Sequence, residues 1–149
     1  MKFQIDQVQT FHEAFGAPVG GTPGICTPER LLLRCNLILE EAKEFLEASN
    51  VYVHTIWNDT AASKQELRTS ENGSPDLVLM SDALMDLLYV TFGTLVELGL
   101  QDRATAMFNH VHESNMSKLG TDGKPILRED GKILKGPGFF KPNLAQFLP

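Results

Sequence analysis

The sequence is poor in cysteine, and from its first residues we expect no apolar leader. It holds two cysteines in 149 residues, Cys26 and Cys35, and their spacing matches no zinc or redox motif. This excludes a disulfide scaffold and favours reduced thiols in a cytoplasmic protein. The N-terminus, Met1 to Asp6, lacks the apolar region of a signal peptide.

Positive charge is also scarce. Thirteen Lys and Arg stand against nineteen Asp and Glu, and the formal net charge of −6 argues against a general nucleic-acid binder. No Gly-rich phosphate loop of the Walker type is present, which argues against ATP-driven work. Asp82 and Asp86 interrupt the most apolar segment, and the part beyond them is too short to span a bilayer, so we expect no membrane partner.

The charge is unevenly distributed. From Ser117 to Lys141 there are six Lys or Arg and three acids, a local charge of +3, so the rest of the chain carries −9. An acidic body with a basic tail suits a metal site that faces a polyphosphate ligand. A solvated tail is the alternative interpretation.

The length and the 42% hydrophobic content favour one domain over residues 1–149 with a hydrophobic core. Helix signals begin at Ile5, at Thr27-Pro28, at Ser74-Pro75 and near Asp102, and glycines at 16 and 99 end two of these segments. Turn dipeptides flanked by apolar residues near Asp130-Gly131 predict a hairpin, followed by an apolar tail that docks on the body or on a partner subunit. We therefore predict an all-α fold of the four-helix-bundle type with a short C-terminal β-hairpin.

Two predictions on packing follow from this fold. The stripe Leu31-Cys35-Leu39-Ala42-Leu46 is expected to lie in the core, and the helix from about Ser74 to Gly99 is expected to be central and buried. Residues 50–75 are less determined: Val51 to Trp57 either extend the preceding helix or form a short extended piece, and Thr60 to Gly73 is expected to be a surface loop.

Carboxylates occur within two of the apolar helical segments. Glu40, Glu41 and Glu44 lie on the first, and Asp82 and Asp86, four residues apart, share one face of the second. Carboxylates in core helices are costly unless a cation neutralises them, and oxygen ligands alone favour Mg²⁺ or Mn²⁺ over zinc. The alternative for the first segment is a solvated face paired with Lys43, but Asp82 and Asp86 lack a basic neighbour in sequence.

These residues carry a family resemblance. Glu40-Glu41-x-x-Glu44, followed by Asp86-Leu87-Leu88-Tyr89, resembles the all-α nucleoside triphosphate pyrophosphohydrolases, which include MazG-like enzymes and phosphoribosyl-ATP pyrophosphohydrolases. The opening Val8-x-x-Phe11-His12-x-x-Phe15-Gly16 and the later 112–118 and 130–137 look like small bacterial members of this group. The resemblance implies a MazG-like helical fold, usually dimeric or tetrameric, and Mg²⁺-dependent cleavage of a nucleoside triphosphate into a monophosphate and pyrophosphate.

The same resemblance implies roles for individual residues. Glu41, Glu44 and Asp86 match metal ligands, and Glu40 matches a ligand or the base that activates water. The family has Glu where this chain has Ala83, and Asp82 lies on nearly the same face as a substitute ligand. The chemistry of phosphoryl transfer, independently of the resemblance, predicts phosphate contacts opposite the metal, and the candidates are Asn115, Lys118, Lys132 and Lys135. The alternative for Lys132 and Lys135 is that they only flank the hairpin.

Other interpretations remain open. A nucleotide-binding or regulatory module weakened in catalysis by Ala83 is one, and a non-catalytic helical interaction protein is another. For the enzyme we expect a nucleotide substrate, a Mg²⁺ or Mn²⁺ cofactor, and a homodimer or homotetramer. The four histidines have no zinc spacing. Core packing is favoured over stacking on a base as the role of Phe11, Phe15, Trp57 and Tyr89.

Overall fold

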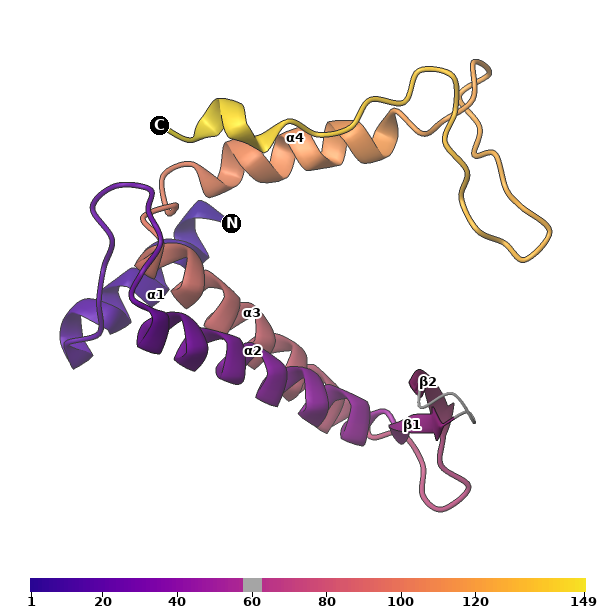
Figure 1. Cartoon of the computed structure of the whole chain (residues 1–149), viewed down its shortest axis with the longest axis horizontal. Helices are drawn as coiled ribbons and strands as arrows, with labels where there is room; N and C mark the ends of the chain where they lie inside the picture. Colours follow the sequence, from indigo (N-terminus) through magenta and orange to yellow (C-terminus); the bar gives the residue numbers. More distant parts are fainter. Residues whose placement is uncertain (58–62) are drawn as a thin grey trace. The chain divides into compact units, whose positions relative to one another are not determined.

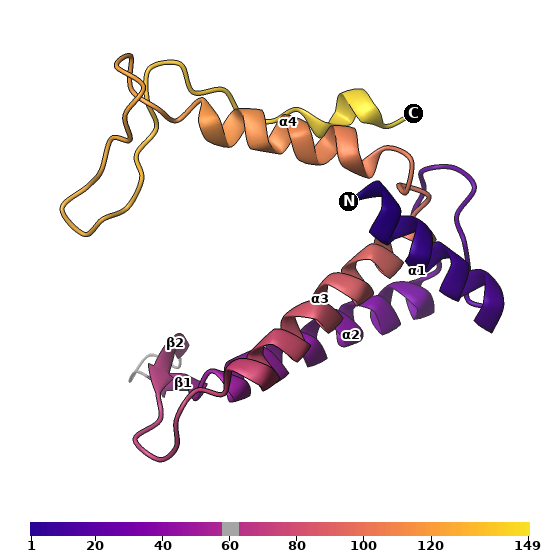
Figure 2. The same cartoon turned by 180° about the vertical axis from the view of Figure 1, so that it is seen from behind.

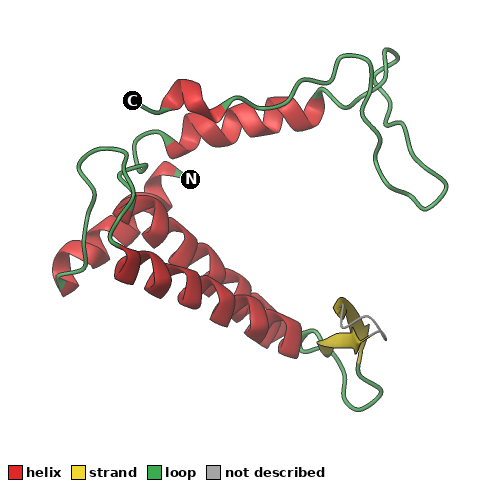
Figure 3. Cartoon of the chain, in the orientation of Figure 1, coloured by secondary structure: helices red, strands yellow, loops and turns green. Residues whose placement is uncertain are grey.

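The computed structural model describes residues 1–57 and 63–149 (Figures 1 and 3). Four α-helices, one antiparallel pair of strands and a 3₁₀ turn make up the regular structure of these residues. Their bounds are α1 Lys2–Phe15, α2 Pro28–Ala48, β1 Val51–Trp57, β2 Ser63–Thr69, α3 Leu77–Glu97, α4 Ala104–Met116 and η1 Leu144–Phe147. The predicted all-α class is roughly matched, but the strand pair lies between α2 and α3 and not near the C-terminus. The four-helix-bundle arrangement stays a prediction.

The chain forms two compact units. The central unit is Ile25–Thr94, which holds α2, the strand pair and most of α3. The terminal unit consists of Met1–Gly24 together with Leu95–Pro149. That the whole of residues 1–149 acts as a single domain stays a prediction.

Helix α1 ends where the sequence predicted. Gly16 follows it in the left-handed conformation (φ 68°), which glycine adopts without the steric cost that a Cβ brings. The sequence predicts core packing for Phe11 and Phe15, but the buried residues of this helix are Ile5, Val8 and His12. Phe11 and Phe15 stack on one another, with ring centroids 4.4 Å apart, and both are exposed.

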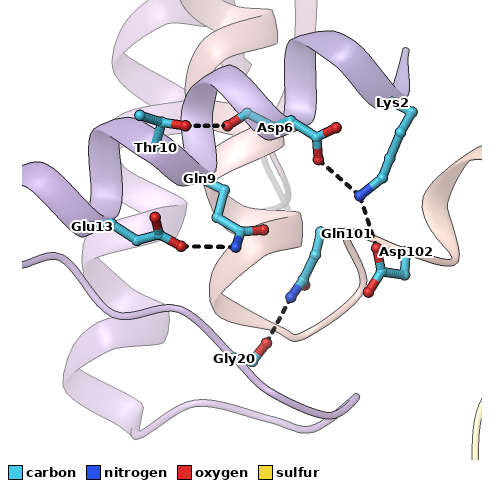
Figure 4. A network of polar contacts seen from close by, with 8 residues as sticks. All are labelled: Lys2, Asp6, Gln9, Thr10, Glu13, Gly20, Gln101 and Asp102. Atoms are coloured by element: carbon cyan, nitrogen blue, oxygen red, sulfur yellow. Dashed lines mark hydrogen bonds and ion pairs between the residues drawn. The ribbon is translucent and has the colours of Figure 1, made fainter.

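Polar contacts join α1 and the loop after it to the end of α3 and the residues that follow (Figure 4). Lys2 Nζ lies 2.8 Å from both Asp6 and Asp102. The Gln101 amide donates to the Gly20 carbonyl oxygen (2.8 Å), and the Gly20 N–H donates to Val96. Gly99 (φ 67°) is needed here, because a Cβ on it would collide with the Thr22 carbonyl.

In the central unit, α2 and α3 lie side by side and run in opposite directions (Figures 1 and 2). Thr27 caps α2, since its hydroxyl accepts from the Arg30 N–H (3.4 Å), and Pro28 occupies the first turn. Asp76 caps α3, since its carboxylate accepts from the N–H groups of Val78 (2.8 Å) and Leu79 (3.1 Å). The cap is therefore two residues beyond the predicted Ser74.

The connection between these helices is a β-hairpin. Val51 to Trp57 form the extended piece that the sequence allowed, but the loop prediction is wrong for Ser63–Thr69, which pairs with it from Val51↔Thr69 to Trp57↔Ser63. The prediction for Thr60 to Ala62 falls outside the described residues. Asn50 (φ 56°) anchors the hairpin at the end of α2, because its side-chain amide donates to the Ser70 carbonyl and its own carbonyl accepts from the Ser70 N–H, both at 2.9 Å.

The predicted packing of the central unit is wrong in this chain. On α2, Cys35 and Leu39 are exposed, and on α3 the side chains of Leu77 and Val78 are each 77% exposed. Apolar residues at helical spacing indicate a face that is shielded from water, but they do not indicate what shields it. A face that a second subunit covers has the same composition as a core.

The membrane argument from the sequence also needs correction. Helix α3 is continuous for 21 residues, and within the described part of the chain it is the one helix long and apolar enough to cross a bilayer. One such helix is weak support for a membrane span. Asp86 lies near its midpoint, where a charged carboxylate costs roughly 2.5–3.5 kcal/mol in a membrane.

The C-terminal segment docks on α4, as one of the predicted alternatives had it. The Ser114 hydroxyl donates to the Phe140 carbonyl oxygen (2.7 Å), and the His110 ring lies against those of Phe140 and Phe147. The predicted hairpin around Asp130-Gly131 reduces to one antiparallel bridge, Leu127↔Ile133. Its tip is closed by the Asp130 carboxylate, which accepts from the Lys132 N–H (3.1 Å).

Candidate active site

Six carboxylates gather along the facing helices of the central unit. We call them the acid cluster: Glu40, Glu41, Glu44 and Glu47 on α2, and Asp82 and Asp86 on α3. On α2 the spacing of three and four residues places Glu40, Glu44 and Glu47 along one stripe. Both helices extend through the cluster without Pro or Gly, so their carboxylates sit on rigid backbone.

Glu41 shows that the two helices share one electrostatic environment. It is half-buried, and burial raises its pKa above the ordinary value of 4.5. The negative charges of Glu44, Asp86, Glu40 and Asp82, in that order, raise the pKa of Glu41 further. Carboxylates of α3 therefore act on a carboxylate of α2, and the repulsion among them is the kind that a divalent cation would relieve.

The burial argument from the sequence is wrong for the other predicted ligands. Glu40, Glu44, Asp82 and Asp86 are exposed in this chain. At the position where the resemblance implies Glu, Ala83 is 4% exposed. The case for a cation thus rests on mutual repulsion centred on Glu41, rather than on the cost of burying every acid.

Two hollows open onto the cluster. One of about 390 Å³ is lined by Glu44, Glu47, Ala48, Leu79 and Asp82, and so lies between α2 and α3. The other, of about 450 Å³, is lined by Asn36, Leu39, Glu40, Lys43, Glu44 and Glu47. Both volumes are in the range of small-ligand sites. Glu47 lines both and is missing from the predicted ligands, although its spacing from Glu40 and Glu44 could have identified it.

The donor set suits a hard cation, because it consists of carboxylate oxygens. Within residues 1–57 and 63–149, no three Asp, Glu, His or Cys side chains stand close enough together to hold an ion as they are oriented. Binding would therefore require rotation of the carboxylates, which their exposure permits.

The predicted phosphate contacts belong to the terminal unit. Lys118 Nζ donates to the Asn115 side-chain oxygen (2.7 Å) at the end of α4. Lys135 Nζ lies 4.5 Å from the centroid of the Phe139 ring, and Lys132 is exposed in the loop closed by Asp130. That these four residues share a site with the acid cluster stays a prediction.

Two histidines have structural partners. His12 is buried with Nδ1 2.8 Å from the Pro18 carbonyl oxygen, which ties α1 to its following loop. His110 Nε2 accepts from the Asn143 N–H (3.1 Å) and so helps to hold the C-terminal segment on α4.

A comparison with protein families decides the wider relationship. The model of the phosphoribosyl-ATP pyrophosphohydrolase family matches residues 8–115. The chain belongs to this family. The match spans most of α1, all of α2 and α3, the hairpin, and α4 to its penultimate residue.

Membership in the phosphoribosyl-ATP pyrophosphohydrolase family supports the MazG-like superfamily resemblance seen in the sequence. It indicates pyrophosphohydrolase activity on nucleotides, a hydrolysis of phosphoric anhydride bonds. The match includes the whole acid cluster and ends at Asn115, so Lys118, Lys132 and Lys135 lie beyond it. Among curated proteins, no match to the chain was found.

Proposed function

We propose that the protein is a Mg²⁺-dependent nucleoside triphosphate pyrophosphohydrolase that cleaves ribo- or deoxyribonucleoside triphosphates to the monophosphate and pyrophosphate. The observation that carries this proposal is the hollow of about 390 Å³ onto which carboxylates of both helices, Glu44, Glu47 and Asp82, open. The pKa of Glu41, raised by burial and by neighbouring carboxylates of α2 and α3, supports it. The family match supports the class of reaction, and the acid cluster supplies the ligand chemistry that a triphosphate substrate needs.

In this proposal Glu41, Glu44, Asp82 and Asp86 hold the metal. When bound, Mg²⁺, or Mn²⁺ in its place, neutralises phosphate charge and makes a coordinated water more acidic. Glu40, in the same stripe and exposed, takes the proton of the attacking water as general base. Asn115, Lys118, Lys132 and Lys135 bind the phosphate oxygens through N–H donors.

We also propose that the protein works as a homodimer or homotetramer. Exposed apolar side chains on both long helices support this, including Leu32 (62% exposed) on α2 and Met85 (59%) on α3. Apolar patches of this extent on a chain with a net charge of −6 fit an obligate interface better than a solvated surface.

The test is pyrophosphate release from the eight canonical ribo- and deoxyribonucleoside triphosphates, with Mg²⁺ and with EDTA. Glu44→Gln and Asp86→Asn should each lose turnover at least a hundredfold, because each removes a charged ligand. The matched control is Glu71→Gln, a neutralised carboxylate in an exposed loop outside the cluster. Circular dichroism should show the same helix content in all variants. Full activity in Glu44→Gln would disprove the ligand assignment.

Ala83 gives one alternative a specific basis. The resemblance implies Glu at this position, whereas this chain offers Asp82, one residue earlier and with a shorter side chain. Nucleotide-dependent thermal stabilisation without turnover would favour a binding or regulatory module. If neither turnover nor stabilisation occurs, a helical interaction protein is the better description.

A further inference from the structure

A third hollow lies where the end of α2 meets the hairpin. Its volume is about 140 Å³, and we call it the hairpin hollow; its lining is Lys43, Leu46, Glu47, Val51, Tyr52 and Val53. Lys43 and Glu47 also line the larger hollow that opens on the acid cluster. The hairpin hollow therefore adjoins the cluster, and all its residues lie in the central unit.

The chemistry changes between the two hollows. The hollow of about 450 Å³ on the acid cluster is lined by three carboxylates, those of Glu40, Glu44 and Glu47. In the hairpin hollow, four of the six lining residues are aliphatic or aromatic. Tyr52 supplies the aromatic ring. Its side chain is 45% exposed, and the ring stands edge-on to that of His54, with centroids 6.4 Å apart and an interplanar angle of 87°. An exposed ring beside aliphatic side chains is the usual surface on which a nucleobase stacks.

The spacing suits one ligand that reaches both hollows. Lys43 and Glu47 are one helical turn apart, about 6 Å along α2, which is within the length of one nucleoside. Lys43 carries the single positive charge among the residues that line the three hollows. Because it lines both the hairpin hollow and a hollow of the acid cluster, it lies at the position between the phosphates and the base of such a ligand.

Hydrogen bonds at the end of α2 hold the strand that carries Tyr52 in place. The backbone of Asn50 and Ser70 closes the base of the hairpin, and the Asp76 N–H donates to the Ala48 carbonyl at the end of α2 (2.9 Å). On the same face of the strand pair, Arg68 lies opposite Tyr52 and forms an ion pair with Glu66. A backbone held in this way keeps Tyr52 at the hollow, so less freedom is lost when a base binds there.

We propose that the hairpin hollow is the nucleobase subsite, with the Tyr52 ring as its stacking surface and Lys43 between base and phosphates. This rests on the proposed nucleotide substrate and assigns to the hairpin the part of substrate binding that the acids cannot supply. The subsite discriminates weakly among bases, because stacking on an aromatic ring depends little on which base is present.

Steady-state kinetics of Tyr52→Ala test the assignment, with the canonical triphosphate that the wild type turns over fastest. KM should rise about tenfold, the effect of losing one base–aromatic stack, while kcat changes less than twofold. Inhibition by pyrophosphate, which has no base, should be unchanged. Tyr52→Phe keeps the ring and should recover most of the lost affinity.

The control is Gln65→Ala, which removes an exposed side chain of β2 that does not line the hollow. An unchanged KM in Tyr52→Ala, an equal rise in Gln65→Ala, or weaker pyrophosphate inhibition would each overturn the subsite. So would a shift of Tyr52→Ala to a smaller assembly in light scattering, which would assign the ring to a subunit interface.

Failure of the proposed reaction gives a different result. If the wild type releases no pyrophosphate from any triphosphate, binding of AMP, GMP, CMP and UMP is measured by ligand-observed NMR with the full chain. Saturation transfer to base protons that Tyr52→Ala abolishes and Gln65→Ala preserves would keep the subsite without the reaction. Absence of transfer in the wild type would overturn it.

Discussion

Glu41→Gln should stabilise the metal-free protein at neutral pH. Glutamine has nearly the shape of glutamate, so the substitution removes a charge and little else. In the folded chain the pKa of Glu41 lies above 4.5, because burial and four neighbouring carboxylates disfavour its ionised form. The ionised Glu41 therefore opposes folding, and its replacement should raise the free energy of unfolding.

The sign of the pH dependence follows from linkage. Below pH 4.5 Glu41 is protonated in both the folded and the unfolded chain, so it carries no charge penalty there. As the pH rises from 4.5 through the raised folded-state pKa, the unfolded chain releases the proton first. Stability due to this group is lost across that window, and the full penalty applies at pH 7.5.

The size of the penalty follows from the exposure of the cluster. Like-charge pairs on partly exposed helix faces each cost a few tenths of a kcal/mol, and Glu41 has four such partners. Glu41→Gln should therefore gain about 1 kcal/mol, which is a rise of about 2–4 °C in the melting temperature of a chain of this length.

The assay is thermal unfolding followed by circular dichroism in EDTA, at pH 7.5 and at pH 4. Glu71→Gln is the control, since it removes one negative charge from an exposed loop outside the cluster. Added Mg²⁺ at ten times its Kd should stabilise the wild type by about 1.4 kcal/mol and Glu41→Gln by much less. A melting temperature that falls in Glu41→Gln at pH 7.5, or a gain of equal size at pH 4, would refute the repulsion argument.

Two further predictions concern packing. Met85→Glu places a charge on the exposed apolar side of α3 and should shift the assembly toward monomers in light scattering, whereas Met85→Leu should not; an unchanged mass would remove α3 from the interface. Gly99→Ala should lower stability by at least 1–2 kcal/mol in denaturant unfolding, because φ is positive there and the new Cβ would collide with the Thr22 carbonyl; a wild-type midpoint would contradict the close approach.

The local signals in the sequence were sufficient for the helices. Thr27-Pro28 begins α2 and Gly16 ends α1 as predicted, because capping depends on residues within one turn of the helix end. The strand Ser63–Thr69 was not predictable in this way. Apart from Leu67, its residues alternate polar and charged side chains, and only Thr69 has a high β-propensity. Pairing with β1 and the anchor at Asn50 therefore determine its conformation.

Burial was predicted poorly for a different reason. Leu39 and Leu77 are apolar residues at helical spacing, yet both are exposed. Helical spacing alone does not distinguish a residue of the core from one on a face that a second subunit covers. The apolar neighbours of Asp82 and Asp86 predict that both acids lie in a core, yet those neighbours are largely exposed in this chain. The conclusion that acids of the two helices lie close together still holds, because Glu44, Glu47 and Asp82 line one hollow between α2 and α3.

The division of charge between the two units bears on how a triphosphate could bind. Residues 25–94 contain eleven acids and five Lys or Arg, so the central unit carries the whole net charge of −6, whereas the terminal unit has eight of each. A polyanion would thus approach the most negative part of the chain. Unless a cation neutralises part of this charge, the negative potential opposes nucleotide binding as well as catalysis.

We therefore expect removal of Mg²⁺ to abolish nucleotide affinity itself. A cation needed only for chemistry would leave the affinity intact and slow turnover alone. Equilibrium binding of a non-hydrolysable triphosphate in EDTA separates these two cases.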